Sequence, residues 1–257
     1  MSDMQAQPVA VPQPQAPALT QMQRVINVFS APSKTFTDIR DHSRSWWLPF
    51  VILSVVGYLF FAVVNSKIGM QQVVDNQTHL SPKAEERLAQ ATPEQREFSN
   101  KLSVGITEGV FLGGPILVLI IVAVGSLVLW GTVNFVFGGK AKYGAIFSMW
   151  MFASLPGIVK PILGSIVIFT GMAPESFNIK NYAPTNIAAL LMNPMETGAG
   201  LYSLASSIDI VTIWTLVLAG IGTATVAGVK RTSGYIAVFG WWAIITLVGA
   251  GLAAAFS

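Results

Sequence analysis

Lys160 and Asp209 are ionisable residues that lie within long apolar stretches of this 257-residue chain. Charges at membrane depth are costly, and they are usually paired with one another or used in function. If the third span runs outward and the fourth inward, Lys160 lies about 13 Å and Asp209 about 8 Å from the outer ends of their predicted helices, at about 1.5 Å of rise per residue. The sequence therefore predicts an ion pair between two spans, with a proton or ion relay as the functional alternative.

The constellations that carry catalysis or bind metals are missing from the sequence. His42 and His79, the two histidines, are far apart and outside the apolar stretches, so no HExxH zinc motif can form. A Ser-His-Asp arrangement would have to use a flanking loop. The chain has no cysteine, which removes disulfides and thiolate chemistry. We expect no enzyme activity, no metal or cofactor and no nucleic-acid partner.

The apolar stretches that must position Lys160 and Asp209 are long enough to cross a bilayer. The composition is 53% hydrophobic and 11% charged, which a soluble domain of this length could not bury in one core. About 20 apolar residues in a helix cross about 30 Å of hydrocarbon, and lipid cannot satisfy the backbone of an open strand. The predicted fold class is all-α, a polytopic transmembrane helical bundle of about five spans. The spans are predicted at 46–66, 110–137, 143–170, 204–228 and 234–256.

The third predicted span contains residues that break helices. Pro156, Gly157 and Pro161 lie near its middle, and each proline removes a backbone hydrogen bond. We therefore expect this helix to be kinked or broken inside the bundle.

The fourth predicted span carries small residues at a spacing of four. Gly220, Ala224 and Gly228 share one helix face, and small side chains let two helices approach closely. This face is predicted to pack against a neighbouring helix, either within one chain or in a homo-oligomer.

The N-terminal region divides into a tail and a helical segment. Residues 1–20 are rich in Pro, Gln and Ala and are predicted to be disordered. Residues 21–45 show an apolar stripe bordered by cations, formed by Met22, Val25, Ile26, Phe29, Phe36 and Ile39. Such a stripe predicts amphipathic helices that either lie in the cytoplasmic interface or pack under the bundle. Trp46, Trp47 and Trp214 are the predicted interface anchors.

The segment 67–109 between the first two predicted spans is polar and charged. Ser81 before Pro82, and the capping-box spacing from Thr92 to Gln95, indicate two helix starts. We interpret the segment as a helical hairpin, which could also bind a partner.

The charge distribution predicts the orientation. Basic residues dominate the N-terminal segment and the loops 138–143 and 229–233: Arg24, Lys34, Arg40, Arg44, Lys140, Lys142, Lys230 and Arg231. On the other side, carboxylates outnumber cations. By the positive-inside rule, the N-terminus is cytoplasmic and, with five spans, the C-terminus is outside.

Several sequence segments resemble the YIP (Ypt-interacting protein) domain family in its prokaryotic form. They are VFSAPSKTF at 28–36, the Trp46, Trp47 and Pro49 entry to the first span, KYGAIFSMWMFASLPGIV at 142–159, SIDIVTIWTLVLAGIG at 207–222, and Lys230 with Trp241–Trp242. The resemblance runs from Asp38 to Trp241. It implies a five-span bundle with a cytoplasmic N-terminus, a non-catalytic role and a bacterial cytoplasmic membrane. Eukaryotic relatives are linked to Rab GTPases, vesicle traffic and membrane shaping.

The sequence thus supports two functions from different classes. The first is a membrane adaptor or membrane-organising factor that works through lipids and through protein contacts of its tail or its 67–109 segment. The alternative is a small-molecule or ion transporter that uses the broken third helix with Lys160 and Asp209. Transporters normally show internal repeats and clustered polar groups, and neither is found here.

Overall fold

The structure, a computed structural model, describes residues 17–256, so most of the predicted disordered tail lies outside the described residues. Within them the chain is helical and forms no sheet, which confirms the all-α bundle. Five segments are long and apolar enough to cross a membrane. They are Trp47–Lys67 (α3), Gly114–Val136 (α7, Gly114–Gly131, with the π-turn Thr132–Val136), Tyr143–Phe169 (α8, Tyr143–Ala153, and α9, Val159–Phe169), Ile210–Ala227 (α12) and Arg231–Ala255 in α13 (Arg231–Phe256).

The span α12 lies at the centre of the bundle. In its most apolar stretch, 56% is buried inside the bundle, whereas the corresponding share is 17–33% in the other spans. It packs against α13, α8 and the N-terminal helix α2 (Pro32–Asp41). Its small residues allow these close contacts, and the main core forms where α12, α8 and α2 meet. A second apolar cluster joins α3 to the segment after α9.

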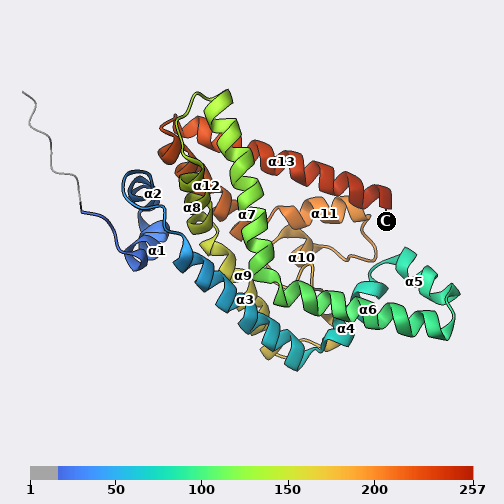
Figure 1. Ribbon diagram of the computed structural model, residues 1–257. Helices are drawn as coiled ribbons and strands as arrows, with labels where there is room; N and C mark the ends of the chain where they lie inside the picture. The colour runs from blue at the N-terminus through green and yellow to red at the C-terminus, as the bar shows by residue number, and fades with distance from the viewer. Residues whose placement is uncertain (1–16, 257) are drawn as a thin grey trace, which may run out of the picture.

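The helices α1 (Gln21–Ser30) and α2 form a hairpin at one end of the bundle (Figure 1). Thr20 and Gln23 form a capping box at the start of α1, and Pro32 occupies the first turn of α2, where its missing N–H is no loss. Leu19 also donates its backbone N–H to Asp38. Asp38 of α2 thus holds the backbone just ahead of α1.

The apolar stripe is buried to different extents on the two helices of this hairpin. On α2, Phe36 and Ile39 are fully buried in the core. On α1, Met22, Ile26 and Phe29 are exposed, and the buried face carries other residues instead. The stripe of α2 thus packs against the spans. On α1, Val25 packs against the core, whereas the other three residues of the stripe are exposed.

The segment after α3 forms the helices α4 (Met70–His79), α5 (Pro82–Gln90) and α6 (Pro93–Leu112), which lie at the opposite end from α1 (Figure 1). The predicted capping box joins Thr92 and Gln95 at the start of α6. The second span begins at Gly114 and not at residue 110, since Gly113 ends α6 and Pro115 stands in the first turn of α7. Glycine and proline in sequence separate the two helices there.

The fourth span also begins later than predicted. Residues 204–207 belong to a separate helix, α11 (Ala199–Ser207), which packs against α13. Asp209 then adopts an extended backbone and caps α12, so the helix restarts at Ile210. Between α9 and α11 the chain forms two short turns of helix, Pro174–Ser176 and α10 (Ile187–Leu191).

Candidate functional site

The structure brings Lys160 and Asp209 together. Lys160 Nζ lies 3.0 Å from Asp209 Oδ2, and the Asp209 side chain is 1% exposed whereas that of Lys160 is 30% exposed. Asp209 also accepts hydrogen bonds from the Thr185 hydroxyl (2.5 Å) and the Thr212 backbone N–H (2.8 Å). The carboxylate is therefore held by three donors from three different segments.

Local structure explains where these two groups stand. Asp209 pairs with Asn186 in an isolated antiparallel bridge, so its backbone is fixed just before the span. Its carboxylate caps α12, where the helix dipole favours a negative charge. Lys160 lies in the first turn of α9, directly after the 3₁₀ turn Leu155–Ile158. The helix break thus aims the ammonium group at the neighbouring helix start.

Asp209 is the residue before the span, and its charge is stabilised there. Burial opposes ionisation, but the hydrogen bonds from Thr185, from the Thr212 backbone and from Lys160 outweigh it and hold the pKa of this carboxyl below its usual value. A carboxylate with a lowered pKa stays ionised at neutral pH. The arrangement therefore resembles a closed structural pair more than a group that exchanges protons.

The third span is interrupted at the predicted residues. The helix α8 ends at Ala153, a 3₁₀ turn runs through Pro156 and Gly157, and α9 continues from Val159 with Pro161 in its first turn. The backbone change occurs inside the bundle, because Leu155 and Pro156 are buried.

The predicted small-residue face of α12 packs within the chain, against α13. A Cβ added at Gly220 would meet the Tyr235 ring, and one added at Gly234 would meet the Gly220 carbonyl and Ala224. Gly228 has a different place: it adopts the left-handed conformation, φ +69°, and ends the helix. The packing face therefore comprises Gly220 and Ala224, with Gly234 opposite them.

The three predicted tryptophan anchors lie in different surroundings. Trp46 precedes α3 and its ring packs against Phe147 at 5.2 Å between centroids. Trp47 is 52% exposed. Trp214 is 41% exposed and contacts Phe29 of α1, with 5.5 Å between ring centroids. Trp214 therefore joins α12 to the N-terminal hairpin.

A buried ion pair between α1 and α2 was not predicted from the sequence. Arg24 Nε donates to Asp38 Oδ2 at 2.6 Å, and the side chains are 1% and 5% exposed. The Thr35 hydroxyl donates to the Arg24 carbonyl, and His42 Nδ1 lies 3.1 Å from Asp38 Oδ1. The available signal was Asp38 itself, a carboxylate between the apolar residues of a helix in an otherwise basic segment.

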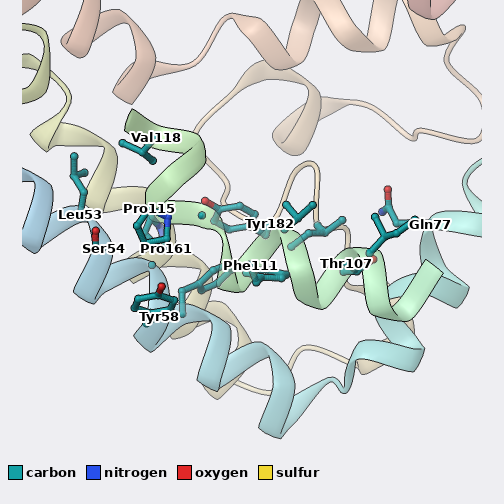
Figure 2. Close-up of a pocket in the computed structure, with 16 residues that line it drawn as sticks. Leu53, Ser54, Tyr58, Gln77, Thr107, Phe111, Pro115, Val118, Pro161 and Tyr182 are labelled. Carbon is teal, nitrogen blue, oxygen red and sulfur yellow. The ribbon is translucent and has the colours of Figure 1, made fainter. Parts of the chain in front are cut away.

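A cavity of about 520 Å³ lies between α3, α6 and α7 (Figure 2). Its lining includes Tyr182 and Pro161, the residue that follows Lys160 in the chain. Burial raises the pKa of the Tyr182 phenol, and the nearby Asp209 charge raises it further. The phenol is therefore neutral at physiological pH. No group of three or more His, Asp or Glu side chains that could hold a metal ion occurs within residues 17–256.

One end of the bundle collects the basic loops. The Lys140 backbone N–H donates to the Ala227 carbonyl, which joins the loop after α7 to the turn after α12. Arg231 donates to the Ser33 hydroxyl and Arg40 to the Thr225 carbonyl, so the N-terminal hairpin lies at the same end.

Five apolar spans, of which α12 is the most buried, define a polytopic α-helical membrane protein. The chain belongs to the Yip1 domain family, because the Yip1 domain matches residues 26–253. This confirms the resemblance inferred over Asp38 to Trp241 and extends it toward both termini. The chain is also similar to the membrane protein YknW of Bacillus subtilis (strain 168), with 23% identity over 217 residues that cover 84% of each chain. No solved structure matches the chain significantly.

Proposed function

We propose that this protein is a non-enzymatic membrane-organising factor or adaptor that works through lipid and protein contacts. The observation that carries the proposal is the N-terminal hairpin: α2 is packed into the bundle, and α1 presents an apolar face outward. Met22, Ile26 and Phe29 on that face are 57%, 59% and 38% exposed. An amphipathic helix with such a face inserts at the boundary between headgroups and acyl chains.

The hairpin lies along α12. Arg40 of α2 contacts the Thr225 carbonyl near the end of α12, and Phe29 of α1 contacts Trp214 nearer its start. The hairpin therefore adds cross-section along one flank of the bundle. Such an asymmetric cross-section favours local reorganisation of the surrounding lipid.

Exposed cations surround the hairpin at this end of the bundle. They are Lys34, Arg44, Lys140, Lys142 and Lys230. Each basic residue near an anionic leaflet contributes about 1 kcal/mol of attraction. By the positive-inside rule this end is cytoplasmic, and the bacterial relative supports a bacterial cytoplasmic membrane as the location. Protein partners would then meet the hairpin and the tail inside the cell and the 67–109 segment outside.

The transporter alternative depends on Lys160 and Asp209. Both groups are engaged, Asp209 by three donors and Lys160 by Asp209 with the Thr212 hydroxyl at 3.5 Å. The adjacent cavity is lined by Pro161 and not by either charged side chain. These contacts favour a structural pair over an ion pathway.

The proposal is tested with the full chain in vesicles of phosphatidylethanolamine and phosphatidylglycerol. A donor dye on a single cysteine at Thr232 reports energy transfer to acceptor-labelled phosphatidylglycerol or to a neutral acceptor lipid. We expect stronger transfer to the anionic lipid. Replacing four of the five exposed cations of the basic end by glutamine should abolish the preference; these four are Lys34, Arg44, Lys140 and Lys230. A control of equal charge change at the other end should retain it; these are Lys83, Arg87, Lys101 and Lys180.

A second variant tests the apolar face. Met22 and Ile26 are replaced by serine, whereas Phe29 is kept because it packs against Trp214. Vesicle shape is then followed by electron microscopy at fixed protein density. We expect the wild-type protein to change vesicle curvature and the variant to lose this effect while its spans remain folded. Equal lipid preference in all charge variants, together with ion flux that disappears on replacing Lys160 and Asp209 by leucine, would overturn the proposal in favour of transport.

A further inference from the structure

The cavity of about 520 Å³ is an elongated groove between α3, α6 and α7. Leu53 and Val118 lie at one end and Gln77 and Thr107 at the other (Figure 2). A volume of about 300–1,000 Å³ is typical of sites that hold a small molecule. The groove is therefore large enough for a ligand and has two chemically different ends.

The Leu53 and Val118 end of the groove lies at the depth of the hydrocarbon, because both residues belong to spans. Tyr58 stands in the middle of the span Trp47–Lys67, and its hydroxyl donates to the Leu112 carbonyl at 2.9 Å. This bond fixes the end of α6 against the centre of α3. Because a bilayer surrounds the middle of a span, this part of the groove is open to lipid, whereas the Gln77 end lies at the polar helices α4 and α6.

The mouth of the groove carries apolar surface. Ile106 and Val110 of α6 are 57% and 54% exposed, and Gly57 of α3 is also exposed. These residues both line the groove and face outward. A ligand could thus enter sideways from the bilayer.

The lining contains no charged side chain among the described residues. Its polar groups are uncharged, and they include the Gln77 amide at one end and the Tyr182 phenol between the two ends (Figure 2). Burial keeps the phenol protonated, since it raises the pKa of Tyr182. An ionised carboxylate would find no countercharge here, whereas an ester or glycerol oxygen would find hydrogen-bond donors.

We propose that this groove binds one acyl chain of a bilayer phospholipid, with the hydrocarbon between Leu53 and Val118 and the ester end toward Gln77. The uncharged lining favours an esterified chain over a free fatty acid. The inference goes beyond the organising role proposed above and does not depend on it, because it concerns a different face of the bundle and requires only that the spans lie in a bilayer.

The test uses a phosphatidylglycerol that carries a photoreactive diazirine in one acyl chain, incorporated into vesicles with the full chain. After irradiation, labelled peptides are mapped by mass spectrometry. Labelling of α3 and α6 should saturate as the probe fraction rises. Labelling of the exposed face of α13, which includes Ile244 and Ile245, should rise in proportion to the probe because it reports bulk lipid.

Filling the groove provides the decisive variant. Gly57 has no heavy atom within 4 Å of an added Cβ, so Gly57→Leu should fold and occupy the groove. Gly240→Leu is the matched control, since Gly240 lies in α13 with equally open surroundings and away from the groove. We expect Gly57→Leu to reduce labelling of α3 and α6 by about tenfold, with α13 unchanged. Gly240→Leu should leave α3 and α6 labelling intact.

Two results would overturn the inference. The first is labelling of α3 and α6 that never saturates and is the same in both variants, which would mean bulk lipid contact only. The second is saturable, Gly57-sensitive labelling by a diazirine fatty acid without labelling by the phospholipid probe, which would assign the groove to a free amphiphile. Either result would leave the lipid-sorting test of the basic end unaffected.

Discussion

Arg24 and Asp209 show how single charged residues are accommodated inside an apolar bundle. The Asp38 carboxylate contacts Arg24, the Leu19 backbone N–H and His42. The Asp209 carboxylate contacts Lys160 and two further donors. A buried charge is tolerated when it is paired and its lone pairs are used. In both cases the carboxylate has more partners than the cation, and the Arg24 Nη1 atom has no hydrogen-bond partner among the described residues.

The first prediction concerns the two contributions of Asp209, its cap and its charge. Asp209→Ala removes both and leaves Lys160 unpaired, so the free energy of unfolding should fall by about 2–3 kcal/mol, a value reduced because Lys160 is partly exposed. Asp209→Asn keeps a good cap and removes the charge, so it should cost about 1–2 kcal/mol. Thermal unfolding of the purified protein in one detergent measures both.

The control for this prediction is Lys160→Met, which removes the cation and leaves the cap intact. It should cost less than Asp209→Ala, because Asp209 retains Thr185 and Thr212. Since the folded-state pKa of Asp209 is lowered, the stabilisation is present above the ordinary value of 3.8 and is lost as pH falls through the folded-state pKa. A Lys160→Leu, Asp209→Leu double variant that unfolds at the wild-type temperature but loses ion flux would contradict a structural role.

Lys160 and Asp209 stood out in the sequence because a charge in an apolar run is conspicuous. Arg24 did not stand out because it lies in a polar, basic segment where a cation is ordinary. Its burial depends on the turn at Ala31 and Pro32, which folds α1 onto α2 and brings residues that are 14 positions apart into contact. Such tertiary contacts leave no periodic signal in a single sequence.

At the scale of the helices, hydropathy predicted which segments cross the membrane but not where two of them begin. The apolar run continues across Gly113 and across Ile208, so hydrophobicity alone cannot mark a boundary there. The backbone changes at these points because Gly113 ends α6, and because Asp209 leaves the helix and caps the next one. Capping chemistry and not hydropathy sets these ends.

The second prediction tests the crossing of α12 and α13. A methyl group at Gly234 would collide with the Gly220 carbonyl and with Ala224, and the backbone cannot give way easily. Gly234→Ala should therefore lower the free energy of unfolding by about 2 kcal/mol. Gly240→Ala in the same helix meets nothing within 4 Å and should be neutral or slightly stabilising. Equal thermal stability of the two variants would contradict this packing.

At the scale of the whole molecule, the two ends of the bundle differ in charge. The hairpin and the loops after α7 and α12 bring basic side chains together at one end, and α4 to α6 lie at the other (Figure 1). Sequence charge counts each loop separately, whereas the fold shows that these loops are neighbours in space. Their concentration at one end supports the proposed cytoplasmic orientation of that end.

The third prediction tests this orientation with single cysteines, which the natural chain lacks entirely. Lys142→Cys places an exposed thiol in the loop before α8, and Ser176→Cys places one in the segment after α9. If basic loops face the cytoplasm, a membrane-impermeant maleimide applied to intact bacterial cells should label Ser176→Cys only. It should label Lys142→Cys after the membrane is permeabilised. Because one span region, Tyr143–Phe169, separates the two sites, they must lie on opposite sides. The reverse labelling pattern would place the hairpin outside the cell, and the anionic cytoplasmic leaflet could then no longer be its lipid partner.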